Sequence, residues 1–493
     1  DVYNTAVGDQ AGTAVTTGIF NTLVGGLSGD ALTEGTRNVA FGKDALTADT
    51  KGSRSTAIGF ATLYSQNFTT ATDAYNTAVG EQAGLNVTTG VSNTLIGALA
   101  GDSLTDADYN VAVGVNALTA DTLGSRSTAL GFNTLATQNL TTATNVYNVA
   151  IGHNAATAVT TGVQNTIIGS LAGQSITTGQ ENVVIGYAAL DGDTAGKGSI
   201  AIGNNSLGVQ NFSTATYSLN TAIGHNSGAS ITTGMQNTIL GAYSGDALQA
   251  SSDNVAVGFE ALSTETGGQN NVAIGPRALK VQVTSSGNIF NTGVGSNAGV
   301  AITQGVHNTC IGGQTAATLT TGQANTIVGF GTNVDTGGRD GSVALGNNLG
   351  THAADNSFRV TGAGGVYNTG NTSAWNTTSD ERIKKNITDS TVGLAEINQI
   401  RVRNFEYRTA DEITEFASLQ EYDLEQLAIA KTGTQVGCIA QELKQIIPSA
   451  VVVDDRGVNN VQDDEIKWHM IKAVQELSTA LDAALARIAT LEG

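Results

Sequence analysis

The segment Asn4-Thr5-Ala6-Val7-Gly8 decides the fold, because its pattern occurs twenty times along the chain. The pattern is Asn or Ser, then two residues, then Val, Ile, Leu or Phe, and finally Gly. Successive copies begin 17, 17, 17 and then 21 residues apart, with 20 once, so they form five units of about 72 residues. The copies begin at Asn4, Asn21, Asn38, Ser55, Asn76, Asn93, Asn110, Ser127, Asn148, Asn165, Asn182, Ser199, Asn220, Asn237, Asn254, Asn271, Asn291, Asn308, Asn325 and Ser342. Such a period indicates a solenoid, in which each repeat stacks on its neighbour.

The five positions of the motif predict a short strand with two apolar faces. Side chains alternate along a strand, so the second and fourth positions share one face, and the large residue at the fourth position is expected to face a core. The third position faces the other way and is also apolar: it is mostly Ala, with Leu23, Leu95, Ile167 and Ile239 in the second turn of a unit. A strand that is apolar on both faces is buried on both. We infer that small Ala side chains let partner chains approach closely, most simply in a homotrimer.

Two further motif positions predict backbone features of the turns. The fifth position is Gly in all twenty copies, which indicates a positive φ or the close approach of a neighbouring strand. The recurring Asn at the first position predicts a ladder of hydrogen bonds along the fibre. Cys310 occupies a third position, so it is expected to be a small buried apolar residue.

Every fourth turn carries extra residues, as in 62–75 and 134–147. Two interpretations remain open for them: a protruding loop that packs on the shaft, or a series of contacts with a receptor or glycan at regular height. The aromatic side chains concerned are Tyr64, Phe68, Tyr75, Tyr147, Phe212 and Tyr217.

Composition excludes several classes of function. Among 493 residues there are 62 Gly but 2 Pro, and 13% are charged, which favours a fibrous or solenoidal β structure. The net charge of −20 argues against binding to nucleic acid or to anionic lipid. No apolar run approaches membrane-spanning length, so no membrane insertion is expected. Neither metal-ligand spacing nor a dinucleotide motif is present, and no cofactor is predicted.

The chain changes character near residue 379. Residues 1–378 contain 10 basic and 22 acidic residues, whereas residues 379–493 contain 12 and 20 in less than a third of the length. We therefore expect a shaft over 1–346, a junction over 347–378 and a small α+β domain over 379–493. Helical patterns cover 392–400, 411–430, 436–447 and 465–491. The last has Ile471, Val474, Leu481, Leu485 and Ile488 at steps typical of a coiled coil.

Three ordered blocks in this domain carry a family resemblance. They are Ser379-Asp380-Glu381-Arg382-Ile383-Lys384 with Asn386-Ile387, then Gly437-Cys438-Ile439-Ala440-Gln441-Glu442-Leu443 with Ile447-Pro448-Ser449-Ala450-Val451, and finally Ile471-Lys472-Ala473-Val474-Gln475-Glu476-Leu477. Together they resemble the endosialidase-type intramolecular chaperone of phage tail spikes and fibres. The shaft resembles the left-handed parallel β-roll of trimeric autotransporter adhesin heads, with a longer period.

The resemblance to the chaperone implies an activity. Such domains trimerise, guide the upstream fibre into register and then release themselves by one cut. By position, Ser379 would be the nucleophile that attacks the carbonyl of Thr378, and Lys384 the general base, with Lys385 beside it. The chain would then be at most a single-turnover, self-cleaving serine endopeptidase. The alternative interpretation of Thr378–Glu381 is a capping box at a helix start.

The leading hypothesis is a homotrimeric phage tail fibre, part of the virion and extracellular, that attaches to the host surface. Its partners would be copies of itself, tail or baseplate proteins, and a host glycan or receptor. One alternative is a bacterial trimeric surface adhesin, which would need a C-terminal membrane anchor where this chain has a polar helix. The other is the shaft of a polysaccharide-degrading tail spike, which would need a pair of carboxylates in a groove.

Overall fold

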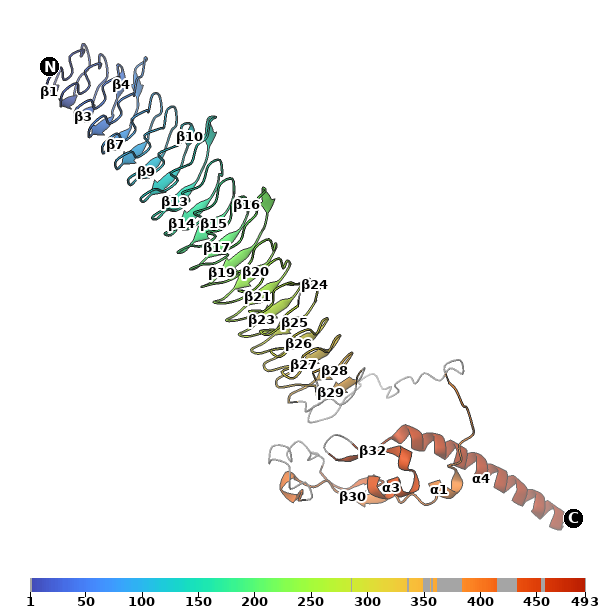
Figure 1. The fold of residues 1–493 in the computed structure, drawn as a ribbon. Coiled ribbons are helices and arrows are strands. Elements are labelled where there is room, and N and C mark those ends of the chain that lie inside the picture. Colours follow the sequence, from blue (N-terminus) through green and yellow to red (C-terminus); the bar gives the residue numbers. More distant parts are fainter. Residues whose placement is uncertain are drawn as a thin grey trace. The chain divides into compact units, whose positions relative to one another are not determined.

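The protein consists of two compact units, Asp1–Arg359 and Val360–Gly493. A computed structural model describes residues 2–284, 286–334, 337–348, 355, 358–360, 384–414, 432–453 and 457–492. Figure 1 shows the first unit as a long stack of turns and the second as a small mixed unit ending in a helix. Each unit is described separately below.

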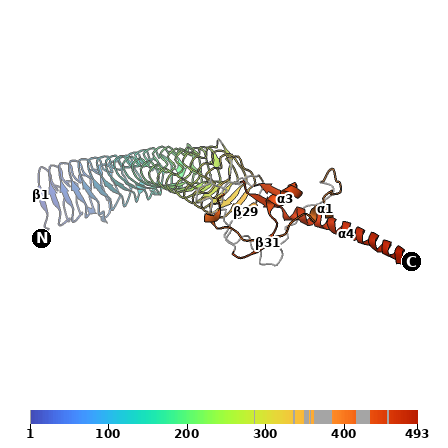
Figure 2. The same ribbon diagram turned by 90° about the horizontal axis from the view of Figure 1, so that it is seen from below.

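The first unit is a parallel β-solenoid of about twenty turns, which confirms the predicted fold. Each turn gives one three-residue strand to a single long sheet, and each pairs in parallel with that of the next turn; a further strand, β29, belongs to the same sheet. Figure 2 shows these strands stacked along the shaft. They are β1 (Thr5–Val7), β2 (Thr22–Val24), β3 (Val39–Phe41), β5 (Thr56–Ile58), β7 (Thr77–Val79), β8 (Thr94–Ile96), β9 (Val111–Val113), β11 (Thr128–Leu130), β13 (Val149–Ile151), β14 (Thr166–Ile168), β15 (Val183–Ile185), β17 (Ile200–Ile202), β19 (Thr221–Ile223), β20 (Thr238–Leu240), β21 (Val255–Val257), β23 (Val272–Ile274), β25 (Thr292–Val294), β26 (Thr309–Ile311), β27 (Thr326–Val328), β28 (Val343–Leu345) and β29 (Phe358–Val360).

The invariant Gly after each strand is required for both predicted reasons. Gly97 has a φ of +133°, a region that side chains other than Gly rarely adopt. A Cβ built there would lie 2.5 Å from the carbonyl oxygen of Gly114 in the next turn. Adjacent turns therefore stack through backbone alone at this point, and no side chain can be added without separating them.

The core lies on the opposite face of the strands from the one predicted. The middle residue of the motif, Ala in most turns, is fully buried inside the coil, as at Ala40 and Ala112. The second and fourth positions point outward, and Val7, Phe41 and Leu130 are exposed large apolar residues. The expectation that the large fourth residue fills the coil and that Ala faces a partner is therefore wrong.

The physical reason is that another corner of the turn already supplies core volume. Leu46 and Leu118 follow the invariant Gly by four residues and are fully buried, and their turns have Ala in the strand. Where that corner is Gly101, the strand residue is instead the large Leu95, and a Cβ on the glycine would lie 2.8 Å from it. In the second to fourth turns of the first two units, the interior thus holds one large side chain at this level, from the corner or from the strand. The first turn of the second unit has Ala78 and Gly84 there, and the leucines of its neighbours, Leu63 and Leu95, fill the space.

The predicted ladder of Asn side chains is present in the buried wall of the coil. The side-chain oxygen of Asn21 accepts the backbone N–H of Asn38 at 3.0 Å, and the Nδ2 of Asn21 donates to the carbonyl of Gly35 at 2.9 Å. The same contacts recur at most later turns, for example from Asn182 to Asn165 at 3.1 Å. Each Asn therefore closes its own turn and joins it to the next.

The extra residues of every fourth turn form a two-stranded parallel ribbon beside the preceding turn. In the first of them, Phe68 is buried against the shaft, whereas Tyr64 and Tyr75 stay exposed, so the loop does pack on the shaft. The ribbons, several of which stand out from the shaft in Figure 1, are β4 (Gly52–Ser53) with β6 (Thr72–Asp73), β10 (Gly124–Ser125) with β12 (Thr144–Asn145), β16 (Gly196–Lys197) with β18 (Thr216–Tyr217), and β22 (Gly268–Gln269) with β24 (Gly287–Asn288).

The second unit combines short helices with two small hairpins. Its core comprises Leu443, Ile447, Ala450 and Val451. Its elements are α1 (Leu394–Ile397), β30 (Arg403–Phe405), the 3-10 turn η2 (Ala410–Glu412), β31 (Gln435–Gly437), α3 (Ala440–Ile446), the 3-10 turn η3 (Pro448–Ala450), β32 (Val451–Val453), β33 (Asn459–Val461) and α4 (Asp463–Glu492).

The predicted helices of this unit are partly corrected. The patterns over 392–400 and 465–491 correspond to α1 and α4. The pattern over 436–447 begins too early, because residues 435–437 pair with β30 as an antiparallel strand and the helix starts at Ala440. Of the helix expected over 411–430, residues 411 and 412 belong to η2, and residues 415–431 lie outside the described part of the chain.

Candidate functional site

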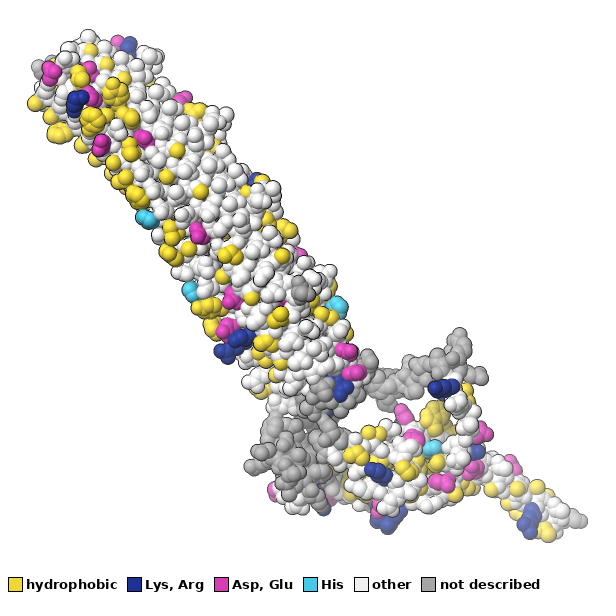
Figure 3. All heavy atoms as spheres, in the orientation of Figure 1, with side chains coloured by type: hydrophobic (Ala, Val, Ile, Leu, Met, Phe, Trp, Pro, Cys, Tyr) yellow, Lys and Arg dark blue, Asp and Glu magenta, His cyan; other side chains and the backbone are white. Residues whose placement is uncertain are grey.

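The outward face of the long sheet is an uncharged stripe that runs the length of the shaft. It consists of the second and fourth motif positions of all twenty turns, here called the sheet stripe. The second position is Thr, Val or Ile, the fourth is Val, Ile, Leu or Phe, and none of these residues is charged. In Figure 3, yellow apolar side chains follow the edge of the shaft on which Figure 1 draws these strands. An uncharged apolar strip of this extent is typical of an interaction surface.

The extra residues of every fourth turn are here called insertions. A buried carboxylate anchors each of the first four insertions. Asp49 is fully buried, and its Oδ1 accepts the backbone N–H groups of Gly52 at 2.9 Å and Phe68 at 3.2 Å. Its Oδ2 accepts the Nε2 of Gln66 at 2.6 Å, and the Oε1 of Gln66 accepts the Nδ2 of Asn76 at 2.9 Å. Burial is the main influence on the Asp49 carboxyl and raises its pKa above the usual range. Because Asp49 accepts the Nε2 of Gln66, the side-chain amide of Gln66 is held with its Oε1 toward Asn76, the first Asn of the next unit.

These carboxylates were not identified from the sequence, although their regular spacing indicates a structural role. The equivalent residues are Asp121, Asp193 and Glu265, each 72 residues after the last and each buried. An acidic residue repeated at the interval of the whole unit, in a shaft with so few charges, is a visible signal. The fifth unit, which begins one residue early because of the single 20-residue step, has Thr336 at this place.

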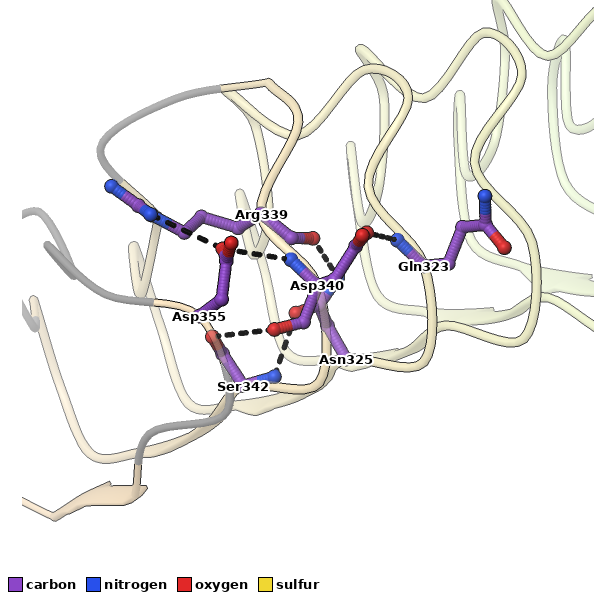
Figure 4. Close-up of polar contacts among 6 residues, drawn as sticks. All are labelled: Gln323, Asn325, Arg339, Asp340, Ser342 and Asp355. Carbon is purple, nitrogen blue, oxygen red and sulfur yellow. Dashed lines mark hydrogen bonds and ion pairs between the residues drawn. The ribbon is translucent and has the colours of Figure 1, made fainter. Parts of the chain in front are cut away.

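The fifth unit instead uses a carboxylate from further along the chain. The Oδ1 of Asp355 accepts the Nη1 of Arg339 at 3.1 Å and the backbone N–H of Asp340 at 3.2 Å (Figure 4). The carbonyl of Arg339 accepts the Nδ2 of Asn325 at 2.6 Å, which continues the ladder. Asp355 therefore ties the last turns together at the C-terminal end of the shaft.

In the second unit, polar contacts hold segments distant in sequence on one small core. The Nη2 and Nε atoms of Arg403 contact the carboxylate of Glu442 at 2.6 and 3.3 Å, and this guanidinium holds the Glu442 pKa below its usual range. The backbone N–H of Leu394 donates to Glu476 on α4 at 2.8 Å. These contacts fix β30 to α3 and α1 to α4, and the two pairs meet at the apolar core, where Ile397 and Ile466 pack against the cluster that includes Leu443.

Within the described part of the chain, the predicted apolar seam of the long helix α4 is left largely exposed. Ile471, Val474, Leu481, Leu485 and Ile488 are 49–64% exposed. A helix that leaves such a series of apolar residues open is typical of one that associates with further helices. Among the helices of the described residues, none is long and apolar enough to cross a membrane.

The structure describes only one of the two candidate catalytic residues. Thr378 and Ser379 lie outside the described residues, and Lys384 is the first residue described after that gap, on the surface before α1. The Thr378–Ser379 bond and the Ser379–Lys384 pair therefore remain predictions.

The fold and its surfaces define a class of protein: a repetitive β-solenoid shaft followed by a small unit with a long helix whose apolar seam is exposed. The comparison with known families agrees with this. Residues 379–452 match the family described as chaperone of endosialidase. The match ends within β32 and contains the first two sequence blocks, whereas the third lies in α4. No curated protein matches the chain. A solenoid shaft followed by a segment similar to the endosialidase chaperone family fits a phage tail fibre or tail spike, as the sequence predicts.

Proposed function

We propose that the chain is a homotrimeric bacteriophage tail fibre that attaches to the host surface, with residues 379–493 gathering three copies. The observation that carries the proposal is the endosialidase-chaperone match directly after a solenoid whose sheet stripe is uncovered. Three copies related by a three-fold axis would cover the sheet stripe and the α4 seam together. Within the virion, the shaft would be held by tail or baseplate proteins.

Light scattering of the intact chain tests the association. A trimer has three times the chain mass of 50.0 kDa, and a monomer would refute the proposal. The double variant Leu130→Lys/Leu240→Lys places charges on the sheet stripe and should enlarge the cross-section measured by small-angle X-ray scattering, because the shafts separate. The matched control is Thr161→Lys/Thr233→Lys, which adds the same charges at exposed turns away from the strands. Equal cross-sections for both variants would show that the stripe is not the interface.

The second part of the proposal is release by self-cleavage. The Ser379 hydroxyl gives its proton to the Lys384 amine as its oxygen attacks the carbonyl carbon of Thr378. The C–N bond breaks as the Ser379 nitrogen takes up that proton, which leaves an ester. Water then hydrolyses the ester to a Thr378 carboxylate and a fragment beginning at Ser379.

Intact-mass measurement tests this step. The wild type and Lys385→Met should release the fragment 379–493, whereas Ser379→Ala and Lys384→Met should stay full length. Lys385→Met is the matched control, since it removes the neighbouring amine. A wild-type chain that stays intact after folding would refute cleavage, and loss of cleavage in Lys385→Met alone would refute Lys384 as the base.

A further inference from the structure

One corner of the N-terminal turns carries a column of aromatic and arginine side chains. It consists of the residue directly before the first motif position in each of nine successive turns and is here called the corner column. Its members are Tyr3, Phe20, Arg37, Arg54, Tyr75, Ser92, Tyr109, Arg126 and Tyr147. The five aromatic members are 45–67% exposed. The column contains three of the five arginines that precede residue 347.

The backbone does not require these residue types. Every member has a φ between 45° and 68°, the left-handed region that favours Gly and Asn and is unfavourable for Tyr, Phe and Arg. The same corner in later turns holds Gly198, Asp253 and Asn270. Neither backbone conformation nor core packing accounts for exposed aromatic rings here. Residues kept at a conformational cost on the surface suggest a function.

The side chains of the corner column contact one another along the shaft. The rings of Tyr3 and Phe20 stack at 5.5 Å between centroids, 3° from parallel. The guanidinium of Arg37 lies 5.8 Å from the Phe20 ring, and that of Arg126 lies 4.8 Å from the Tyr109 ring. At the N-terminal end of the shaft, Figure 3 shows dark-blue side chains among yellow ones.

The insertions add polar groups beside these rings. Arg54 lies 5.4 Å from the Tyr75 ring, and its Nε contacts Asp73 at 2.9 Å. Arg126 donates from its Nε to the side-chain oxygen of Asn145 at 3.0 Å. Beside each of the first two insertions, an aromatic ring, a guanidinium and a carboxylate or amide therefore lie together on the surface.

We propose that the corner column binds a neutral polysaccharide strand that lies parallel to the shaft. A sugar ring has an apolar C–H face that packs on an aromatic ring, and its hydroxyl groups pair with guanidinium, carboxylate and amide groups. Successive members of the corner column are about 4.8 Å apart along the shaft, close to the length of one pyranose unit in an extended chain. This assignment rests on the proposed role in host attachment and gives that role a ligand class and a place.

Charge separates this ligand from the other candidates. Residues 1–150 contain 5 basic and 12 acidic residues, which disfavours a polyanion such as single-stranded nucleic acid or an acidic glycan. A second copy of the chain is the occupant suited to the uncharged sheet stripe. The corner column differs from the stripe because Arg37, Arg54 and Arg126 would be desolvated in such an interface.

The experiment applies the intact chain to an array of neutral and acidic bacterial polysaccharides, beside Tyr75→Ala/Tyr109→Ala/Tyr147→Ala. The matched control is Gln164→Ala/Gln236→Ala/His307→Ala, which truncates the same corner in later turns. We expect binding to neutral polysaccharides that is weakened at least about tenfold by the tyrosine variant and not by the control.

Light scattering of the same samples separates this inference from the proposed assembly. A tyrosine variant that remains trimeric and loses polysaccharide binding supports the site. Absence of binding to every neutral polysaccharide, equal binding by the tyrosine variant, or loss of the trimer in that variant would overturn it. A wild-type chain that is monomeric yet binds through the column would refute the trimer and leave the site intact.

Discussion

Replacing the buried carboxylate of the first insertion, Asp49→Ala, should loosen that insertion and leave the other three unchanged. The substitution removes the acceptor for the N–H groups of Gly52 and Phe68 and for the Nε2 of Gln66. Gln66 retains the Ser55 hydroxyl at 3.0 Å, so two backbone donors are left without their acceptor. A buried donor that loses its partner costs about 1–3 kcal/mol, so the loss is about 2–6 kcal/mol.

Part of this cost is offset, because the variant no longer buries a carboxylate. That gain is consistent with the raised pKa of Asp49, whose main cause is burial. The expected net decrease in the free energy of local opening is about 2–4 kcal/mol, which corresponds to roughly 30- to 1000-fold faster amide exchange in residues 50–75.

Hydrogen-exchange mass spectrometry of the intact chain measures this effect. The insertions anchored by Asp121, Asp193 and Glu265 are matched internal controls, because they have the same architecture in the same molecule. A second control, Asp73→Ala, removes an exposed carboxylate from the same insertion. Exchange in residues 50–75 that stays within about threefold of the wild type would refute the anchoring role. Equal acceleration in all four insertions would show that the effect is not local.

Three further outcomes follow from the structure. Gly97→Ala should destabilise the shaft by about 3 kcal/mol or more, seen as a lower denaturation midpoint, because its Cβ would lie 2.5 Å from the Gly114 carbonyl oxygen; an unchanged midpoint would contradict the stacking. Leu485→Lys should weaken association in light scattering, since the seam of α4 would carry a charge. Burial raises the pKa of the Cys310 thiol to about 12, so at pH 8 the folded chain should be alkylated at Cys438 and not at Cys310; modification of Cys310 would show that the coil opens there.

The sequence was sufficient to predict the solenoid because its period, its glycines and its asparagines all serve contacts between adjacent turns. A Gly that allows backbone stacking and an Asn that bonds to the next Asn have one structural role each, so their positions can be interpreted without the rest of the turn. The number of turns and the Asn ladder follow directly from them.

The orientation of the strand could not be predicted in the same way, because core volume is shared between two places in the turn. Leu95 fills the coil where the corner is Gly101, and Ala112 suffices where the corner is Leu118. Judged by size alone, the fourth position is the better core candidate. The compensating change at the corner, six residues after the strand centre, identifies the third position instead.

The sheet stripe has a consequence for assembly of the proposed trimer. Its forty positions are alike from turn to turn and uncharged, so two shafts shifted by one turn would bury almost the same surface. The insertions oppose shifts of one, two or three turns, because they recur every fourth turn. A shift of four turns aligns the insertions and the stripes again. The shaft alone therefore favours the correct register over this shifted one only weakly. The information that fixes the register therefore has to come from a part of the chain that is not repeated, and the residues after 379, which match the chaperone family, meet this condition.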